Sequence, residues 1–212
     1  ARAGQATMVD SDGLLKWAPH NLVPYSEDQT QWYSYAGAAT RTADSITFTT
    51  ATTDRRATTY SDGIQTVAGL DYKIVADFTV DDGLPVIALG AWNSQYKFAW
   101  ASYDTTLLTS DFYILSNPVN GITVDSCVNI SGNIWRLTVG YTAGASIPTK
   151  VLVQLGAAGQ TARQLRFSGV GTGSCGVTNV HSFRSDLGGM VNNSATGNSY
   201  VPTTSSAVYA PR

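Results

Sequence analysis

The residues with the clearest potential for ligand chemistry lie between positions 92 and 103. Residues 92–97 read Trp-Asn-Ser-Gln-Tyr-Lys and join two expected strands, the second of which continues to position 103. Flat aromatic rings can stack on sugar rings, while amide and ammonium groups can bind sugar hydroxyls. The pattern predicts a shallow carbohydrate-binding patch, for which the candidate residues are Trp92, Asn93, Gln95, Tyr96, Lys97 and Tyr103.

Alternation along the second strand gives some of these aromatic residues another interpretation. Tyr96, Phe98 and Trp100 fall on one face of that strand, and three aromatic residues on one strand face are typical of a hydrophobic core. We therefore expect Phe98 and Trp100 to be buried. Trp92, which falls in a loop, and Tyr103, which faces the other way, are the better candidates for exposure.

Hydrolytic chemistry finds little support in the acidic residues. Glycoside hydrolases usually place two carboxylates across a cleft. Glu27 is the only glutamate among the 15 acidic residues, so a pair of glutamates is excluded, although pairs with aspartate remain possible. Aspartates in expected turns, where the side chain caps the backbone, are Asp10, Asp12, Asp62, Asp81 and Asp82. The acidic residues therefore favour a protein that is not an enzyme.

Nucleophilic catalysis and nucleotide binding find no better support. His20 follows Pro19 in a connector, and His181 falls in an expected strand beside Asn179 and Phe183, where a partly buried structural role is expected. Residues 171–176 match G-x-G-x-x-G, but an expected strand follows instead of the helix that a phosphate-binding loop requires. We interpret this segment as a hairpin loop.

Metal and disulfide chemistry stay open. Calcium takes oxygen ligands, and Glu27, Asp28 and Asp186 could form a structural calcium site if the strands near the two chain ends pair. No other cofactor is expected. Cys127 and Cys175 are either two free thiols or one disulfide, and they do not form a zinc-site pattern.

The composition indicates which elements must position these residues. Only 13% of the 212 residues are charged, about half of the usual fraction, and Thr, Ser, Gly and Asn replace them. Because Glu and Lys favour helices and their replacements do not, the composition predicts an all-β protein. A net charge of -2 gives no reason to expect nucleic acid or anionic lipid as a partner. No apolar run is long enough for insertion into a membrane.

Short alternating segments separated by turn residues agree with this fold class. Residues 6–9 and 14–17 flank Asp-Ser-Asp-Gly and predict an N-terminal hairpin. Residues 72–80 alternate and predict the clearest strand, while residues 84–91 are mostly apolar and predict a central one. Further expected strands are residues 45–51, 56–60, 95–103, 112–115, 122–130, 134–141, 149–155, 162–167 and 177–183. About a dozen strands at this spacing are typical of an antiparallel β-sandwich or barrel.

The segments suggest three parts of the chain. We expect an N-terminal hairpin and connector at residues 1–20, a β-sandwich domain at residues 21–189, and an extended C-terminal segment at residues 190–212. The last segment is polar, and we expect it to lie over the surface or to reach a neighbouring subunit. The chain begins without Met or an apolar leader, so we expect a processed product or a piece of a longer protein.

Three regions resemble a recurring module of tailed-bacteriophage virion proteins. Residues 1–28 combine a hairpin with the pattern N-L-x-x-Y-S-E, and Trp32 follows shortly after. Residues 183–190 and 199–204 resemble the end of the same module, and residues 132–137 resemble its Gly-Asn-x-Trp-Tyr-Arg strand without the Tyr. The resemblance implies a tail-fibre or virion-surface module with a jelly-roll sandwich similar to carbohydrate-binding modules. It does not identify ligand residues.

Together these observations lead to one expectation and two alternatives. We expect a non-enzymatic virion module that binds a host-surface or environmental glycan, contacts other virion subunits and forms a homo-oligomer, which would be a trimer in a fibre. The first alternative is a purely structural fibre or decoration protein without a glycan ligand. The second is a polysaccharide-degrading enzyme on the same sandwich.

Overall fold

The structure is a computed structural model of the 212-residue chain. It describes residues 7–9, 15–17, 20–34, 39–48, 58–80, 83–93, 98–115, 119–166, 173–187, 203, 205 and 208–209. Within these ranges the regular elements are strands and short 3₁₀ helices.

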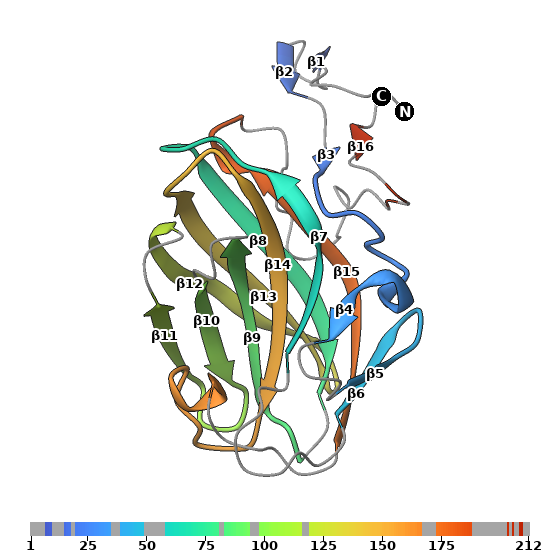
Figure 1. The fold of residues 1–212 in the computed structure, drawn as a ribbon. Coiled ribbons are helices and arrows are strands. Elements are labelled where there is room, and N and C mark those ends of the chain that lie inside the picture. The colour runs from blue at the N-terminus through green and yellow to red at the C-terminus, as the bar shows by residue number, and fades with distance from the viewer. Residues whose placement is uncertain are drawn as a thin grey trace.

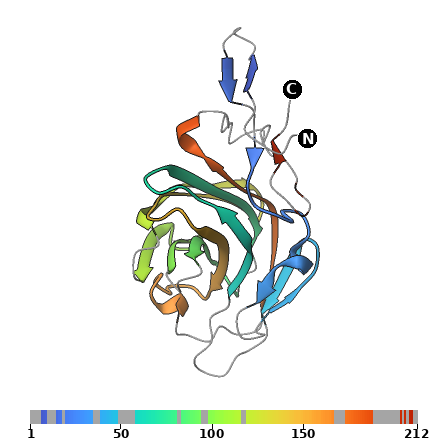
Figure 2. The ribbon, with the colours of Figure 1, turned by 45° about the horizontal axis from the view of Figure 1, so that its top comes forward.

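Two six-stranded antiparallel sheets pack face to face and form a β-sandwich, which confirms the expected fold class (Figures 1 and 2). The front sheet contains, in spatial order, β11 (Thr109–Leu115), β10 (Phe98–Asp104), β9 (Val86–Asn93), β14 (Pro148–Gly156), β7 (Thr58–Gln65) and β4 (Tyr33–Ser34). The back sheet contains β12 (Val119–Ser131), β13 (Ile134–Ala143), β8 (Asp71–Thr79), β15 (Gly173–Arg184), β6 (Ser45–Phe48) and β5 (Ala39–Arg41).

Alternation along β8 explains how the two sheets share a core. Tyr72, Ile74 and Phe78 face the front sheet and are at most 1% exposed, as their period of two predicts. β9 lies between β10 and β14, and all of its residues are buried, which confirms the expectation of a central strand. The core between the sheets therefore follows from the sequence pattern.

A second, smaller core lies on the outer face of the front sheet. There the loop after β14 folds back, and its residues Ala162 and Leu165 pack against Trp100. The Trp100 indole nitrogen donates a hydrogen bond to the Ala162 carbonyl oxygen at 2.8 Å. Gly90 makes room for this arrangement, because a Cβ there would overlap the Trp100 Cβ. The expected strand at residues 162–167 is wrong: a turn at residues 162–163 and the 3₁₀ helix η3 (Gln164–Arg166) occupy the part of it that the structure describes.

Two places where turns or loops were expected lie in strands instead. Asp62 lies inside β7 and not in a turn. Of the G-x-G-x-x-G segment, Gly173 and Gly176 lie in β15, which pairs with β6 there, so its second half is strand and not a hairpin loop. Asp10, Asp12, Asp81 and Asp82 lie outside the described residues.

Two short strands from opposite parts of the sequence, near residues 20 and 208, lie beside each other (Figure 1). β1 (Thr7–Val9) and β2 (Leu15–Trp17) form the expected N-terminal hairpin, and β3 (His20–Asn21) pairs with β16 (Val208–Tyr209). Thr203 is buried; its backbone nitrogen donates to the Ser26 hydroxyl at 3.0 Å, and its own hydroxyl donates to the Val23 carbonyl oxygen. The described part of the C-terminal segment thus lies against its own chain.

Candidate functional site

The predicted aromatic patch does not form a single surface. Trp92 lies on the outer face of the front sheet, where it is 9% exposed and stacks on Phe98 with ring centroids 5.2 Å apart. Tyr103 faces the space between the sheets and packs beside Trp135, with centroids 6.2 Å apart. Asn93 is 1% exposed. The expected exposure of Trp92 is therefore wrong, and the front sheet separates it from Tyr103.

The remaining residues of that patch have different outcomes. Gln95, Tyr96 and Lys97 lie outside the described residues. Phe98 and Trp100 are buried, as expected. The Trp92 ring is also covered by Lys150, whose ammonium nitrogen lies 5.2 Å from the indole centroid and 5.0 Å from the Tyr33 centroid. The Trp92 ring is thus in contact with Lys150 and Phe98 of the protein itself.

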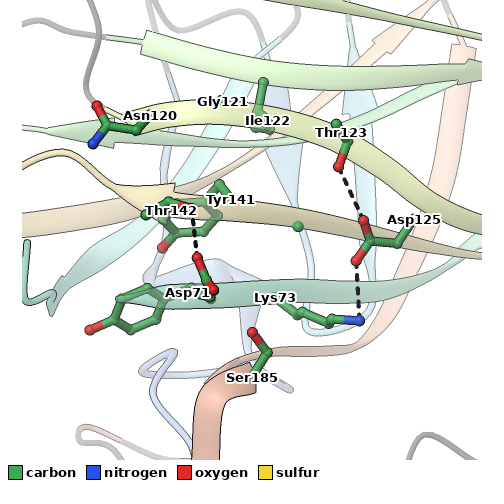
Figure 3. A pocket seen from close by; sticks show the side chains of 12 residues that line it. Asp71, Lys73, Asn120, Gly121, Ile122, Thr123, Asp125, Tyr141, Thr142 and Ser185 are labelled. Atoms are coloured by element: carbon green, nitrogen blue, oxygen red, sulfur yellow. Dashed lines mark hydrogen bonds and ion pairs between the residues drawn. The ribbon is translucent and has the colours of Figure 1, made fainter. Parts of the chain in front are cut away.

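A polar groove on the back sheet gathers the candidate functional groups instead. It has a volume of about 320 Å³ and lies on the outer face of β12, β13 and β8. Thr123, Gly140 and Lys73 are direct neighbours across these three strands. Figure 3 shows the side chains that reach it. Its lining comprises Asp71, Tyr72, Lys73, Asn120, Gly121, Ile122, Thr123, Asp125, Gly140, Tyr141, Thr142 and Ser185.

Two hydrogen-bonded groups lie at separate places along the groove (Figure 3). In the first, the Thr142 hydroxyl donates to the Asp71 carboxylate at 2.6 Å. In the second, the Thr123 hydroxyl donates to Asp125 at 3.1 Å, and the Lys73 ammonium nitrogen lies 3.2 Å from the other Asp125 oxygen. These contacts hold the carboxylates in place while both aspartates remain exposed to solvent.

Irregularities of β12 bring its polar residues to the groove. The register with β13 shifts between Val119 and Ile122 and again between Val124 and Ser126. The first shift contains Gly121, whose φ of 98° is a left-handed conformation that glycine adopts without a steric cost. The second contains Asp125, whose side chain extends over Gly140 of β13. Bulges of this kind re-aim side chains and are frequent beside functional sites.

Gly140 forms the floor between Asp125 and Lys73. A Cβ built on Gly140 would lie 2.8 and 2.9 Å from the two Asp125 carboxylate oxygens. The carboxylate can therefore reach Lys73 only because β13 has no side chain at this position. Gly140 thus defines both the depth of the groove and the position of its ion pair.

The chemistry of the groove suits a neutral, polyhydroxylated ligand. Carboxylate oxygens accept hydrogen bonds, an ammonium group donates them, and hydroxyls do both. Two carboxylates (Asp71 and Asp125) and one ammonium (Lys73) leave one net negative charge among the lining residues. Tyr141 adds no hydrogen-bonding group to the groove, because its ring is buried and stacks on Tyr72 in the core between the sheets.

Two of the three expected calcium ligands, Asp28 and Asp186, bind other groups of the protein. Asp28 accepts hydrogen bonds from the backbone nitrogen and hydroxyl of Thr30 at the start of the 3₁₀ helix η1 (Gln29–Gln31). Asp186 forms an ion pair with Arg184 at 2.6 Å. Glu27 is exposed. Within the described ranges, no three His, Cys, Asp or Glu side chains lie close enough to hold a metal ion.

A buried polar network lies further along the back sheet. Arg136 donates two hydrogen bonds to Asp77 at 2.6 and 2.7 Å, and Asn179 donates a third at 2.7 Å. Next to it, Nδ1 of His181 lies 2.8 Å from the Asn179 carbonyl oxygen. Burial lowers the pKa of His181 to about 4. The imidazole is therefore neutral at pH 7, which agrees with the expected structural role.

The two cysteines are free, so the disulfide alternative is excluded. Cys127 lies on β12 and Cys175 on β15, in separate parts of the back sheet. Burial raises the pKa of the Cys127 thiol to about 12. It is therefore a poor nucleophile at neutral pH.

Sequence reasoning missed the groove because its residues come from three distant segments. Residues 71–73, 120–125 and 140–142 meet only through the register of β8, β13 and β12. The available signals were an isolated glycine at position 121, which indicates a bulge in a strand, and the exposed aspartates. Neither signal specifies which strands are neighbours.

Comparisons with known proteins add no further assignment. The chain matches no protein-family model and no curated protein. No helix in the described part of the chain is long and apolar enough to cross a membrane.

Proposed function

We propose that this chain is a non-enzymatic β-sandwich module of a tailed-phage virion that binds a glycan in the groove over β12, β13 and β8. The observation that carries the proposal is the mixture of fixed acceptors and donors in one exposed groove, formed by Asp71, Lys73 and Asp125 with the neighbouring Thr123 and Thr142. The resemblance of residues 1–28, 132–137, 183–190 and 199–204 to virion modules supports the location on a phage particle.

Each groove carboxylate already has a protein partner, and this favours binding over cleavage. A glycosidase needs one protonated carboxyl group to act as the general acid. Asp125 instead contacts the Lys73 ammonium and the Thr123 hydroxyl, an arrangement suited to a carboxylate that accepts hydrogen bonds. Shallow sites of this type bind weakly one at a time, and display of many copies on a particle would raise the avidity.

A glycan array tests the proposal with the full chain displayed in many copies on a bead. We expect binding to neutral oligosaccharides, and we expect Lys73→Met and Asp71→Asn each to weaken it about tenfold, because each removes a charge-assisted hydrogen bond. Lys150→Met is the matched control, since it removes a lysine from the opposite sheet and should leave binding unchanged.

Other outcomes would favour the alternatives. An absence of binding to every glycan in multivalent format would favour a purely structural virion protein. Release of reducing ends from a bound polysaccharide would favour an enzyme. Binding that depends on Lys150 and not on Lys73 would move the site to the aromatic side of the front sheet.

A further inference from the structure

A small hollow of about 140 Å³ lies between the β10–β11 hairpin and the loop that follows β14, residues 157–166 (the covering loop). Figure 1 shows η3 of this loop beside the two strands. Ser102 and Asp104 follow Trp100 at every second position and share its outer face of the front sheet. Their cross-strand neighbours on β11 are Asp111 and Thr109. These last four side chains line the hollow, so its sheet side presents oxygen-bearing groups.

Asp104 is only 5% exposed and holds its carboxylate in a fixed orientation. The carboxylate accepts hydrogen bonds from the backbone nitrogens of Thr106, Leu107 and Gly159 at 2.9, 2.9 and 2.8 Å. Burial raises the pKa of Asp104, but these hydrogen bonds outweigh burial and bring the pKa below 3.8. The group is therefore ionised at neutral pH. Because a carboxylate has about four lone-pair positions, one remains available.

Asp111 faces the hollow from β11 and contacts the covering loop. Its carboxylate accepts hydrogen bonds from the backbone nitrogens of Phe112 at 2.8 Å and Ala162 at 2.9 Å, which leaves about two lone-pair positions. No Lys, Arg or His lines the hollow. Neither Asp104 nor Asp111 forms an ion pair within the part of the chain that the structure describes. Two carboxylates thus face one hollow without a compensating cation from these residues.

Ser102 gives an independent indication of a ligand. It is 2% exposed and lines the hollow, yet its hydroxyl has no hydrogen-bonding partner among the described residues. Buried polar groups are nearly always hydrogen-bonded. A buried hydroxyl beside two carboxylates therefore points to a bound group that takes oxygen ligands.

We propose that this hollow binds one calcium ion through Asp104, Asp111 and Ser102. Calcium takes about six to eight oxygen ligands in flexible geometry, and water molecules can supply several of them. Two carboxylates with remaining lone pairs, a buried hydroxyl and a hollow with room for water suit this ion. Magnesium fits less well, because it demands a near-ideal octahedron of short bonds.

A calcium ion here would fasten the covering loop to the β10–β11 hairpin. Gly159 and Ala162 of the loop already donate to the two carboxylates, so an ion bound to the same carboxylates would hold both ends of this contact. The site differs from the one expected at Glu27, Asp28 and Asp186. It does not depend on the proposed glycan binding, since the groove lies on the other sheet.

Calorimetry tests the site by titrating the chelator-treated full chain with calcium chloride at pH 7. We expect one calcium ion per chain and weaker binding of magnesium. Asp111→Asn should weaken calcium binding about tenfold, because calcium affinity depends on the charge of the ligands, and Ser102→Ala by a smaller factor. Asp28→Asn is the matched control: it removes an exposed carboxylate far from the hollow and should leave the affinity unchanged.

Hydrogen exchange of residues 157–166 provides a readout besides affinity. Calcium should slow exchange of the loop amides in the wild-type chain and in Asp28→Asn, but much less in Asp111→Asn. Ser102→Ala should fold normally, because its hydroxyl contacts no described group, so its weaker binding cannot be attributed to unfolding. Absence of calcium binding, equal affinities for all four proteins (an adventitious ion only), or loop exchange that calcium does not change would overturn the proposal.

Discussion

Asp125 reaches over Gly140 and places its carboxylate oxygen 3.2 Å from the Lys73 ammonium nitrogen. The contact joins β12 to β8 across the intervening β13. It exists because a bulge frees Asp125 from the ladder and because β13 presents no side chain beneath it. One ion pair thus connects two strands across a third and lies over the groove floor at Gly140.

Gly140→Ala should displace Asp125 and reduce ligand binding with little change in stability. The new Cβ would lie under 3 Å from the carboxylate, which must rotate away from Lys73. Because the pair is partly exposed, its loss should cost less than about 1 kcal/mol. We expect an unchanged melting temperature within a few degrees and a clear loss of affinity for the array-selected glycan, measured by calorimetry.

A double-mutant cycle separates this explanation from a general effect on β13. If the alanine acts through the Asp125 carboxylate, then Gly140→Ala should have little further effect on binding in an Asp125→Ala background. Equal effects of Gly140→Ala in both backgrounds would contradict the explanation.

Asp77→Asn should destabilise the fold by about 3 kcal/mol, since breaking a buried ion pair leaves a charge without compensation. Arg136 and Asp77 are 15% and 6% exposed at their side chains, and Asn179 donates to the same carboxylate. An amide would direct an N–H group toward a donor. The free energy of unfolding in urea provides the measurement.

The exposed pair of Arg184 and Asp186 offers the control. Their side chains are 20% and 32% exposed, so Asp186→Asn should cost no more than about 1 kcal/mol. Comparable losses for Asp186→Asn and Asp77→Asn would show that burial does not determine the energetic role of Asp77.

Trp100→Phe should loosen the loop that covers the front sheet. The indole hydrogen bond to the Ala162 carbonyl oxygen would be lost, and the smaller ring would leave a cavity beside Leu165. Arg163 lies in this loop and is exposed. We therefore expect faster tryptic cleavage after Arg163, detected by mass spectrometry, while circular dichroism stays that of a β protein. Cleavage at the wild-type rate would contradict the proposed role of the hydrogen bond.

The strand pattern was predictable where alternation is long and uninterrupted. Period two predicted β8 and its buried Tyr72 and Phe78 correctly, and the apolar run predicted the central position of β9. Residues 162–167 failed because a short segment in which apolar and polar residues are mixed cannot distinguish a strand from a loop that returns over a sheet. Local pattern was sufficient for regular strands and insufficient for the covering loop.

The site was less predictable for a physical reason. Burial of Trp92 depends on the covering loop and on Lys150 from β14, neither of which is near it in sequence. The groove depends on the register of β12, which two bulges change. Since one residue of shift moves a side chain to the opposite face, the neighbours of Asp125 could not be derived from the sequence alone.

The free energy of unfolding should fall as the pH is lowered from about 6.5 to about 4, because His181 binds a proton more readily in the unfolded chain. Burial lowers its pKa from 6.5 to about 4 in the folded state. In this interval the unfolded chain is protonated while the folded chain is not, so acid favours unfolding. The contribution of His181 to the free energy of unfolding is fully present above pH 6.5, and its loss on acidification amounts to about 3 kcal/mol.

Urea denaturation at half-unit steps between pH 8 and pH 4 measures this effect, with His181→Gln as the comparison. The variant should be less stable at pH 7, because it loses the stacking of the ring on Phe183, but its stability should change less in this interval. The pKa values of Asp104 and Asp186 are lowered from 3.8 in the folded state. Their protonation would therefore reduce the free energy of unfolding only below the pH interval in which His181 acts. Because His20 is present in both proteins, the difference between the two profiles reports His181, and parallel profiles would contradict the assignment.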